Sequence, residues 1–152
     1  MYACILVPID HSTQGQHGLD EAIKLAAALS SKIRLVHVVD LRALIQGVAG
    51  YAPTEQLIED WKAAGEKLVA EATARVREKG VAVESVVLCD PALRICDAII
   101  EEAKKAPAQL IVMGTHGRRG FSRLVMGSDA ELVLRSSPVP VMLVRGEEPE
   151  PA

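Results

Sequence analysis

The sequence predicts a single α/β domain built on a five-stranded parallel sheet. Five short runs rich in Val, Ile and Leu alternate with segments whose apolar residues recur at helical spacing. Such runs are typical of strands buried on both faces, and parallel strands need crossovers long enough to hold a helix. Because these crossovers are right-handed, helices cover both faces of the sheet. A length of 152 residues with 49% hydrophobic and 3% aromatic content fits one core of aliphatic side chains.

The first forty residues predict a βαβ unit. Strands are expected at 3–9 and 32–39, with a helix between them. Ser12 or Thr13 can cap this helix, and Thr13 with Gln16 would form a capping box. The apolar face of the helix carries Leu19, Ala22, Ile23 and Ala26.

A loop and a long helix are expected next. Residues 40–52 read as an irregular loop rich in apolar side chains. The helix runs from about 53 to 79 because apolar residues line one side of it, and Gly80 is its expected stop. The third strand is predicted at 81–89.

The last third of the chain completes the sheet. Asp90 and Pro91 suggest a cap and a first-turn proline for a helix. The inward face of that helix carries Leu93, Cys96, Ile99 and Ile100. The fourth strand is expected at 110–113 and the fifth, at the sheet edge, at 138–144. A helix starting near Ser128 separates them.

A glycine-rich segment joins the fourth strand to that helix. Gly114 and Gly117 can take positive φ and lack a Cβ, so backbone N–H groups can close around an anion. Gly127 and Ser128 open the helix, whose N-terminus favours phosphate. The same segment carries three arginines, Arg118, Arg119 and Arg123. The segment therefore predicts a phosphate site, and the alternative is a surface loop with ordinary turn and cap glycines.

Better-known phosphate motifs do not match this segment. A P-loop requires a lysine before the hydroxyl residue, and Ser128 has none. A dinucleotide fingerprint follows the first strand, whereas these glycines follow a late one. Ligands of open parallel sheets bind beyond the carboxyl ends of the strands. Four predicted strand ends supply polar groups or glycine there, at Asp10, Asp40, Asp90 and Gly114.

The spacing of these glycines resembles the ATP-binding signature of the universal stress protein family, the UspA-like proteins. The signature here is Gly114, two residues, Gly117, nine residues, then Gly127 and Ser128. The similarity extends from residues 5–10 through 35–39 to 138–144. It implies the adenine nucleotide alpha hydrolase-like fold, a Rossmann-like, doubly wound sheet with strand order 3-2-1-4-5. The domain would span 1–146, followed by a disordered acidic tail at 147–152.

The resemblance also implies a set of nucleotide-binding residues. Asp10 would accept a hydrogen bond from the adenine amino group, although alone it is equally a turn or capping residue. The backbone of Val38 would read the adenine edge, while periodicity by itself places Val38 in the core. His116 either donates to a phosphate or faces solvent. The full set is Pro8, Ile9, Asp10, Val38, Met113, Gly114, His116, Gly117, Arg118, Gly127, Ser128 and Asp129.

One residue departs from the pattern of the family. Asp129 stands where many nucleotide-binding members carry a small or β-branched residue. Its carboxylate suits the helix dipole but adds negative charge beside the phosphates. It would act through Mg²⁺ or would weaken triphosphate binding. ATP is the expected ligand, with AMP or ADP as alternatives.

Composition and motifs limit the class of function. A net charge of −3 gives no general attraction to nucleic acid or membrane, and no stretch reaches the length of a membrane span. Cys4, Cys89 and Cys96 match no metal or disulfide spacing, which favours reduced thiols in the cytoplasm. Catalytic motifs are missing, so a dedicated enzyme is not expected.

Three functions follow in order of preference. The first is a nucleotide-dependent stress-response signalling or interaction module. The second is a dimeric interaction protein with a vestigial pocket, and the third is a slow ATPase or phosphotransferase. Family members dimerise through their final strand, so the resemblance implies a homodimer through 138–144, with a further protein partner of unknown identity.

Overall fold

A five-stranded parallel sheet forms the centre of the protein. The structure, a computed structural model, describes residues 1–47, 51–115 and 126–146. The strands are β1 (Cys4–Pro8), β2 (Lys32–Val38), β3 (Val83–Leu88), β4 (Leu110–Gly114) and β5 (Val141–Val144). Their order is β3-β2-β1-β4-β5, which confirms the fold class and the strand order implied by the resemblance. The order reverses between β1 and β4, where sheets of this kind open a ligand crevice at the carboxyl ends.

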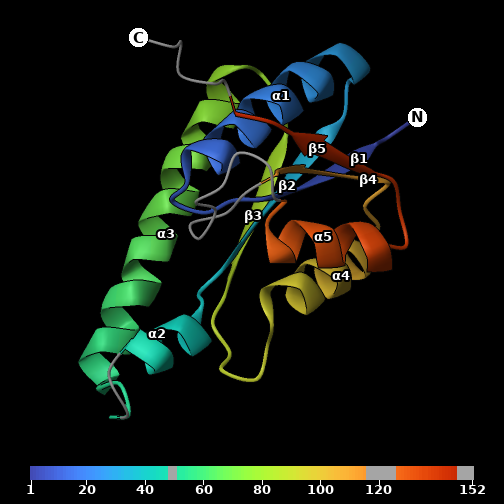
Figure 1. The fold of residues 1–152 in the computed structure, drawn as a ribbon. Coiled ribbons are helices and arrows are strands. Elements are labelled where there is room, and N and C mark those ends of the chain that lie inside the picture. Colours follow the sequence, from blue (N-terminus) through green and yellow to red (C-terminus); the bar gives the residue numbers. More distant parts are fainter. Residues whose placement is uncertain (48–50, 116–125, 147–152) are drawn as a thin grey trace, which may run out of the picture.

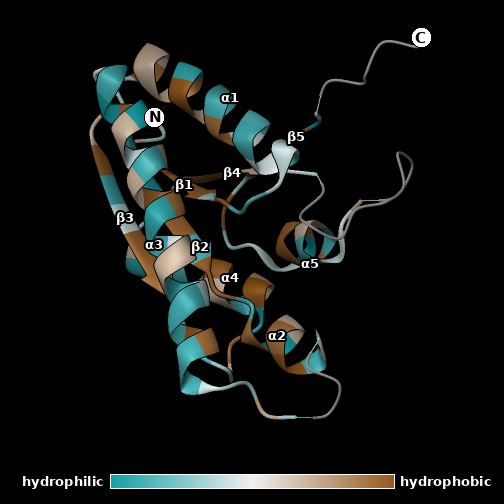
Figure 2. Ribbon diagram, turned by 90° about the vertical axis from the view of Figure 1, so that its left-hand side faces the viewer, coloured by the Kyte–Doolittle hydropathy of each residue, from teal (hydrophilic) through white to brown (hydrophobic). Residues whose placement is uncertain are grey.

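Helices cover both faces of the sheet (Figure 1). On one face lie α1 (Thr13–Leu29) and α3 (Glu55–Glu78), and on the other lie α4 (Ile95–Lys105) and α5 (Ser128–Ser136). Two hydrophobic clusters fill the layers between sheet and helices. Figure 2 shows this division as apolar strands behind largely polar outer surfaces on α1 and α3. The largest of the fully buried side chains are Ile5, Leu6, Leu19, Ile33, Leu35, Ile99 and Ile111.

The start of α1 differs in one respect from the expectation. Ser12 is the N-cap, and its hydroxyl accepts a hydrogen bond from the Gly15 amide at 3.0 Å. The predicted capping box of Thr13 and Gln16 is wrong because Thr13 is already helical. The Gln16 side chain instead accepts a hydrogen bond from Arg75, which ties α1 to α3.

The segment predicted as an irregular loop contains a short helix, α2 (Leu41–Gly47). Asp40 starts it, because its carboxylate accepts a hydrogen bond from the Ala43 amide at 3.0 Å. Leu41 and Leu44 are buried against the first turns of α3, whereas Ile45 is exposed. The loop expectation failed because a polar cap and two leucines three residues apart are enough for two helical turns. Val48 lies outside the described residues.

Two further elements begin later than the sequence suggested. Asp90 does not cap α4: its side chain accepts from the Ala92 amide at 2.8 Å in a local turn, and the helix begins only at Ile95. The fifth strand begins at Val141 rather than at residue 138, because a proline at 138 or 140 has no N–H to donate to a ladder. Before α4 and before β5, a local turn therefore forms in place of the first residues of the predicted helix or strand.

The three cysteines are free thiols. Cys4 and Cys96 are buried, and burial raises the pKa of both thiols. Cys89 is half-buried at the end of β3.

A charged cluster occupies the amino ends of β2 and β3. Glu102 on α4 is buried, and its Oε1 accepts hydrogen bonds from Nε and Nη2 of Arg34 at 2.9 and 2.7 Å. The exposed Glu84 lies 3.2 Å from Lys32 and 3.4 Å from Arg34. These side chains line a hollow of about 290 Å³. The hollow lies at the amino ends of the strands, so it is separate from the carboxyl edge of the sheet.

The buried ion pair gives a stability prediction. Arg34→Met should lower the free energy of unfolding by about 3 kcal/mol, because it leaves the Glu102 carboxylate buried without a partner. Urea unfolding followed by circular dichroism measures the loss. The control is Glu84→Gln at the exposed partner, which should cost roughly 0.5 kcal/mol or less. Equal effects of the two variants would contradict the assignment of Glu102 as a buried charge held by Arg34.

Candidate functional site

The predicted site residues that the structure describes gather at the carboxyl edge of the sheet. Pro8 ends β1, with Ile9 and Asp10 directly after it, Val38 ends β2, and Met113 with Gly114 ends β4. Gly127, Ser128 and Asp129 stand at the start of α5. A hydrogen bond of 2.9 Å from the Gly127 amide to the Thr115 carbonyl joins the start of α5 to the end of β4. His116, Gly117 and Arg118 lie outside the described residues, as do Arg119 and Arg123.

Asp10 is held in one orientation by the start of α1. Its Oδ1 accepts hydrogen bonds from the Ser12 amide at 2.9 Å and from the Ser12 hydroxyl. Helix α1 approaches so closely that a Cβ on Gly15 would lie 2.5 Å from the same oxygen. Within the described part of the chain, Asp10 makes no other side-chain hydrogen bond, so Oδ2 keeps its full capacity to accept. The turn role and the ligand role of Asp10 are therefore compatible, since each uses a different oxygen.

Gly114 has a different physical role from the one expected. Among the glycines that the structure describes, only Gly80 has positive φ, at 72°. A Cβ on Gly114 would instead lie 2.6 Å from the Gln14 carbonyl oxygen in the first turn of α1. Glycine at this position lets α1 pack directly on the end of β4. The expectation of a left-handed backbone was wrong here, and close helix–strand packing replaces it.

The start of α5 is the part of the site suited to an anion. Gly127 is the N-cap with φ −59°, and it provides no side-chain hydrogen bond to the helix. Its own N–H is used by Thr115, so it is not among the amides that could face a phosphate. Ser128 is exposed and is the first residue of α5. An anion placed here would meet the positive end of the helix dipole and the Ser128 hydroxyl.

Asp129 lies within electrostatic reach of α4. Arg94 at the start of α4 makes two hydrogen bonds to Asp97, at 2.7 and 3.2 Å. These bonds are the main reason that the pKa of Arg94 is raised and that of Asp97 lowered, and the Asp129 carboxylate raises the pKa of Arg94 further. Arg94 therefore offsets part of the negative charge that Asp129 brings to the start of α5.

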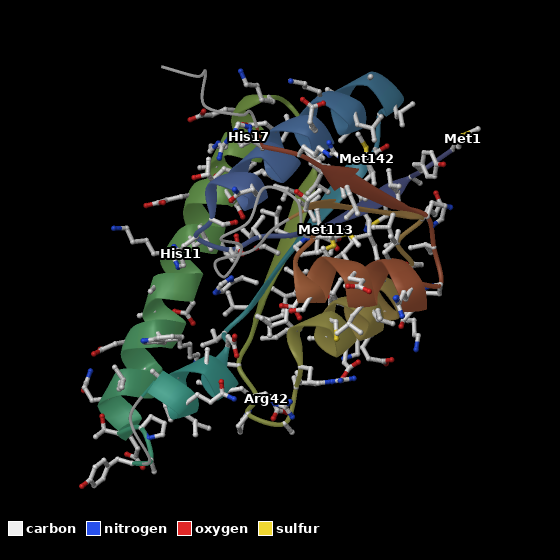
Figure 3. All side chains as sticks on the ribbon, in the orientation of Figure 1. Met1, His11, His17, Arg42, Met113 and Met142 are labelled. Carbon is white, nitrogen blue, oxygen red and sulfur yellow. The ribbon has the colours of Figure 1, made fainter. Side chains whose placement is uncertain are left out.

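Val38 and Met113 belong to the hydrophobic core between the sheet and the helices α4 and α5. Both side chains are buried in this core cluster. Figure 3 shows Met113 between the sheet and α5. Any contact of these two residues with a ligand would have to come mainly from their backbone atoms, as the resemblance implied for Val38.

Sequence reasoning missed two residues that shape the site. Ser12 was expected to be a cap, and it also fixes the carboxylate of Asp10. His37 was expected to be a strand residue, and its buried imidazole also lies 2.8 Å through Nδ1 from the carbonyl oxygen of Ile9. An Asp-x-Ser pattern after a strand could have indicated the first role. No local pattern indicates the second, since the partners are 28 residues apart.

Within 1–47, 51–115 and 126–146, no group of three or more His, Cys, Asp or Glu side chains could hold a metal ion. None of the helices in those ranges is both long enough and apolar enough to cross a membrane.

Solved structures of the same fold include nucleotide complexes. A universal stress protein in complex with cAMP superposes with a TM-score of 0.66 at 21% identity, covering 95% of this chain and 97% of that one. One from Archaeoglobus fulgidus in complex with dAMP has a TM-score of 0.66 at 22% identity, covering 93% and 97%. At these identities the likeness establishes the fold.

Closer relatives establish the family. Universal stress protein MJ0531 of Methanocaldococcus jannaschii is 30% identical over 151 residues, which cover 99% of this chain and 86% of the relative. A crystal structure of a universal stress protein family member from Burkholderia pseudomallei is 31% identical, with a TM-score of 0.76 and coverage of 94% and 96%. The model of the universal stress protein family matches residues 1–145. The chain therefore belongs to the universal stress protein family.

Proposed function

We propose that this protein binds an adenine nucleotide at the carboxyl edge of its sheet and acts as a nucleotide-dependent stress-response signalling or interaction module. The observation that carries the proposal is Asp10, whose Oδ1 is held by Ser12 while Oδ2 remains able to accept. Relatives of the same fold bind cAMP and dAMP, which share an adenine base. The role proposed here is binding, with no catalytic step assigned to the protein.

In this proposal the base and the phosphates occupy opposite ends of the crevice. Oδ2 of Asp10 accepts a hydrogen bond from the adenine amino group, and the backbone near Pro8, Ile9 and Val38 borders the base. The phosphates lie at the start of α5, near Gly127 and Ser128. His116, Gly117 and Arg118 remain proposed phosphate contacts, and Met113 with Gly114 forms the floor between the two ends.

ATP is the proposed ligand, with ADP and AMP as alternatives, and Asp129 bears on the choice. Its carboxylate would repel a triphosphate unless Arg94 or a bound Mg²⁺ balances the charge. Asp129 can hold the ion only together with the phosphate oxygens, as is usual for Mg²⁺. We therefore expect Mg²⁺ to matter more for ATP than for AMP.

We expect the purified protein to bind ATP, with Asp10 selecting the base. Isothermal titration calorimetry with ATP, ADP, AMP and GTP measures this directly. Asp10→Ala should lower the affinity for ATP by about tenfold, because one hydrogen bond to a charged group is lost. It should also reduce the preference for ATP over GTP. Nucleotide released on denaturing the protein and separated by ion-exchange chromatography provides an independent check.

Two variants serve as controls for that titration. Asp90→Ala removes an aspartate from another strand end without touching the crevice between β1 and β4, and its ATP affinity should equal that of the wild type. Asp129→Asn should raise the affinity for ATP in EDTA and lower it in Mg²⁺ if the carboxylate acts through the ion. Absence of any nucleotide binding, with or without Mg²⁺, would refute the proposed function.

A homodimer through β5 is the second part of the proposal. Among the described strands, β5 is at one edge of the sheet, and Met142 on it is 38% exposed. An apolar edge strand of this kind favours pairing with a second copy. A further protein partner is also proposed, and a reducing compartment such as the cytoplasm suits the three free thiols.

The dimer predicts a solution mass of twice the chain mass of 16.3 kDa, measured by light scattering after size exclusion. Met142→Lys should shift the protein toward monomer, because a charge at the edge opposes pairing. Leu29→Lys, at an exposed apolar residue on α1, is the matched control and should leave the mass unchanged. A monomeric wild type at micromolar concentration would count against the β5 interface.

If the dimer forms but nucleotide does not bind, the favoured function becomes that of an interaction protein with a vestigial pocket. Turnover of ATP faster than that of a catalytically inert control protein would instead favour the slow ATPase or phosphotransferase.

A further inference from the structure

His37 is a buried polar side chain next to the candidate site. It lies on β2 with 7% of its surface exposed, and its Nδ1 is 2.8 Å from the carbonyl oxygen of Ile9. A carbonyl oxygen can only accept, so Nδ1 must carry the proton. The hydrogen bond therefore fixes the tautomer of neutral His37 and holds the Ile9 carbonyl where β1 ends.

Helix α3 fixes the far edge of the same ring. A Cβ on Gly65 would lie 2.6 Å from Cδ2 and 3.0 Å from Nε2 of His37, so the ring packs directly on the helix backbone. His11 closes another side, since its ring meets that of His37 edge to face with centroids 5.9 Å apart. In Figure 3 the His11 side chain lies beside α3. The imidazole is thus confined by the helix, by His11 and by the strand that carries it.

Holding the Ile9 carbonyl also holds Asp10. The peptide unit is planar, so the oxygen of Ile9 and the nitrogen and Cα of Asp10 move together. The Asp10 side chain is then fixed by Ser12. A continuous set of contacts therefore runs from Gly65 through His37 and Ile9 to the carboxylate proposed to recognise adenine.

We infer that His37 is a positioning residue for base recognition, holding the Ile9–Asp10 peptide so that Asp10 meets the amino group of adenine. This inference rests on the proposed function. It predicts that Gly65, on helix α3, influences which nucleotide is bound.

Four variants test the inference by calorimetry with ATP and GTP. Gly65→Ala should lower the affinity for ATP by about tenfold and reduce the preference for ATP over GTP, because its methyl group displaces the imidazole of His37. His37→Ala should have a similar effect, whereas His37→Asn should stay within about twofold of the wild type because its amide can donate from the place of Nδ1. In the double variant, adding Gly65→Ala to His37→Ala should cause no further loss, since the ring it displaces is gone.

The matched control is Gly47→Ala, another helical glycine, whose added Cβ would have nothing within 4 Å. It should bind ATP and GTP like the wild type. Circular dichroism establishes that each variant is folded. Two outcomes would overturn the positioning role of His37. One is an additive loss of ATP affinity in the double variant, and the other is a folded His37→Asn variant whose ATP affinity is clearly lower than that of the wild type.

A measurement without nucleotide separates this inference from the proposed function. In ¹⁵N-labelled protein, Gly65→Ala should shift the amide signals of Asp10 and Ser12, and Gly47→Ala should not. If the wild type binds no nucleotide, the proposed function fails, and the role of His37 in base recognition fails with it. The amide shifts would still report whether His37 holds the Ile9–Asp10 peptide in place. Unchanged Asp10 and Ser12 signals in Gly65→Ala would show that contacts through His37 do not connect Gly65 to Asp10, and would refute the inference.

Discussion

The candidate site depends on how the chain turns out of the sheet at Ile9 and Asp10. The last ladder contact of this strand is the hydrogen bond from the Ile9 amide to the Val36 carbonyl, at 2.9 Å. Beyond it, side chains replace the ladder: His37 holds the Ile9 carbonyl, and Ser12 holds the Asp10 carboxylate. The result is a corner with a defined shape at the point where the strand order reverses.

Close packing of α1 extends the same constraint to β4. Two glycines allow it, because a Cβ on Gly114 would meet the Gln14 carbonyl and a Cβ on Gly18 would lie 3.0 Å from the Gly114 amide nitrogen. A third, Gly15, allows the approach to β1, because its Cβ would meet Asp10. The helix therefore lies against the ends of both β1 and β4. At the opposite end of the sheet, the pair of Arg34 and Glu102 joins β2 to α4 and contributes to stability rather than to the proposed binding. Under the proposed function, the two ends of the sheet have separate roles.

The alternation of apolar runs and helical segments was sufficient to predict a parallel sheet covered by helices, and the family resemblance supplied the strand order. The sequence was weaker at element ends, where short-range hydrogen bonds decide. Asp90 turns back on Ala92 instead of capping α4, and Asp40 starts a helix where a loop was expected. The role of Gly114 was also misjudged, since only the packed structure reveals how near Gln14 lies.

The family resemblance supplied the list of candidate site residues, and their binding role stays a prediction. Asp10, Gly114 and Ser128 meet at one edge because parallel strands end together. The contribution of His37 could not be predicted, because periodicity describes only which face a strand residue occupies. Its bond to Ile9 depends on strand pairing and on the absence of a side chain at Gly65.

The most direct test of this account is a map of amide chemical shifts in ¹⁵N-labelled protein during titration with ATP and Mg²⁺. The account predicts that the largest changes fall at Asp10, Gly114 and Ser128, while Lys32 and Glu84 at the other end of the sheet stay unchanged. Changes centred on Lys32 and Glu84, or no changes at millimolar ATP, would contradict it.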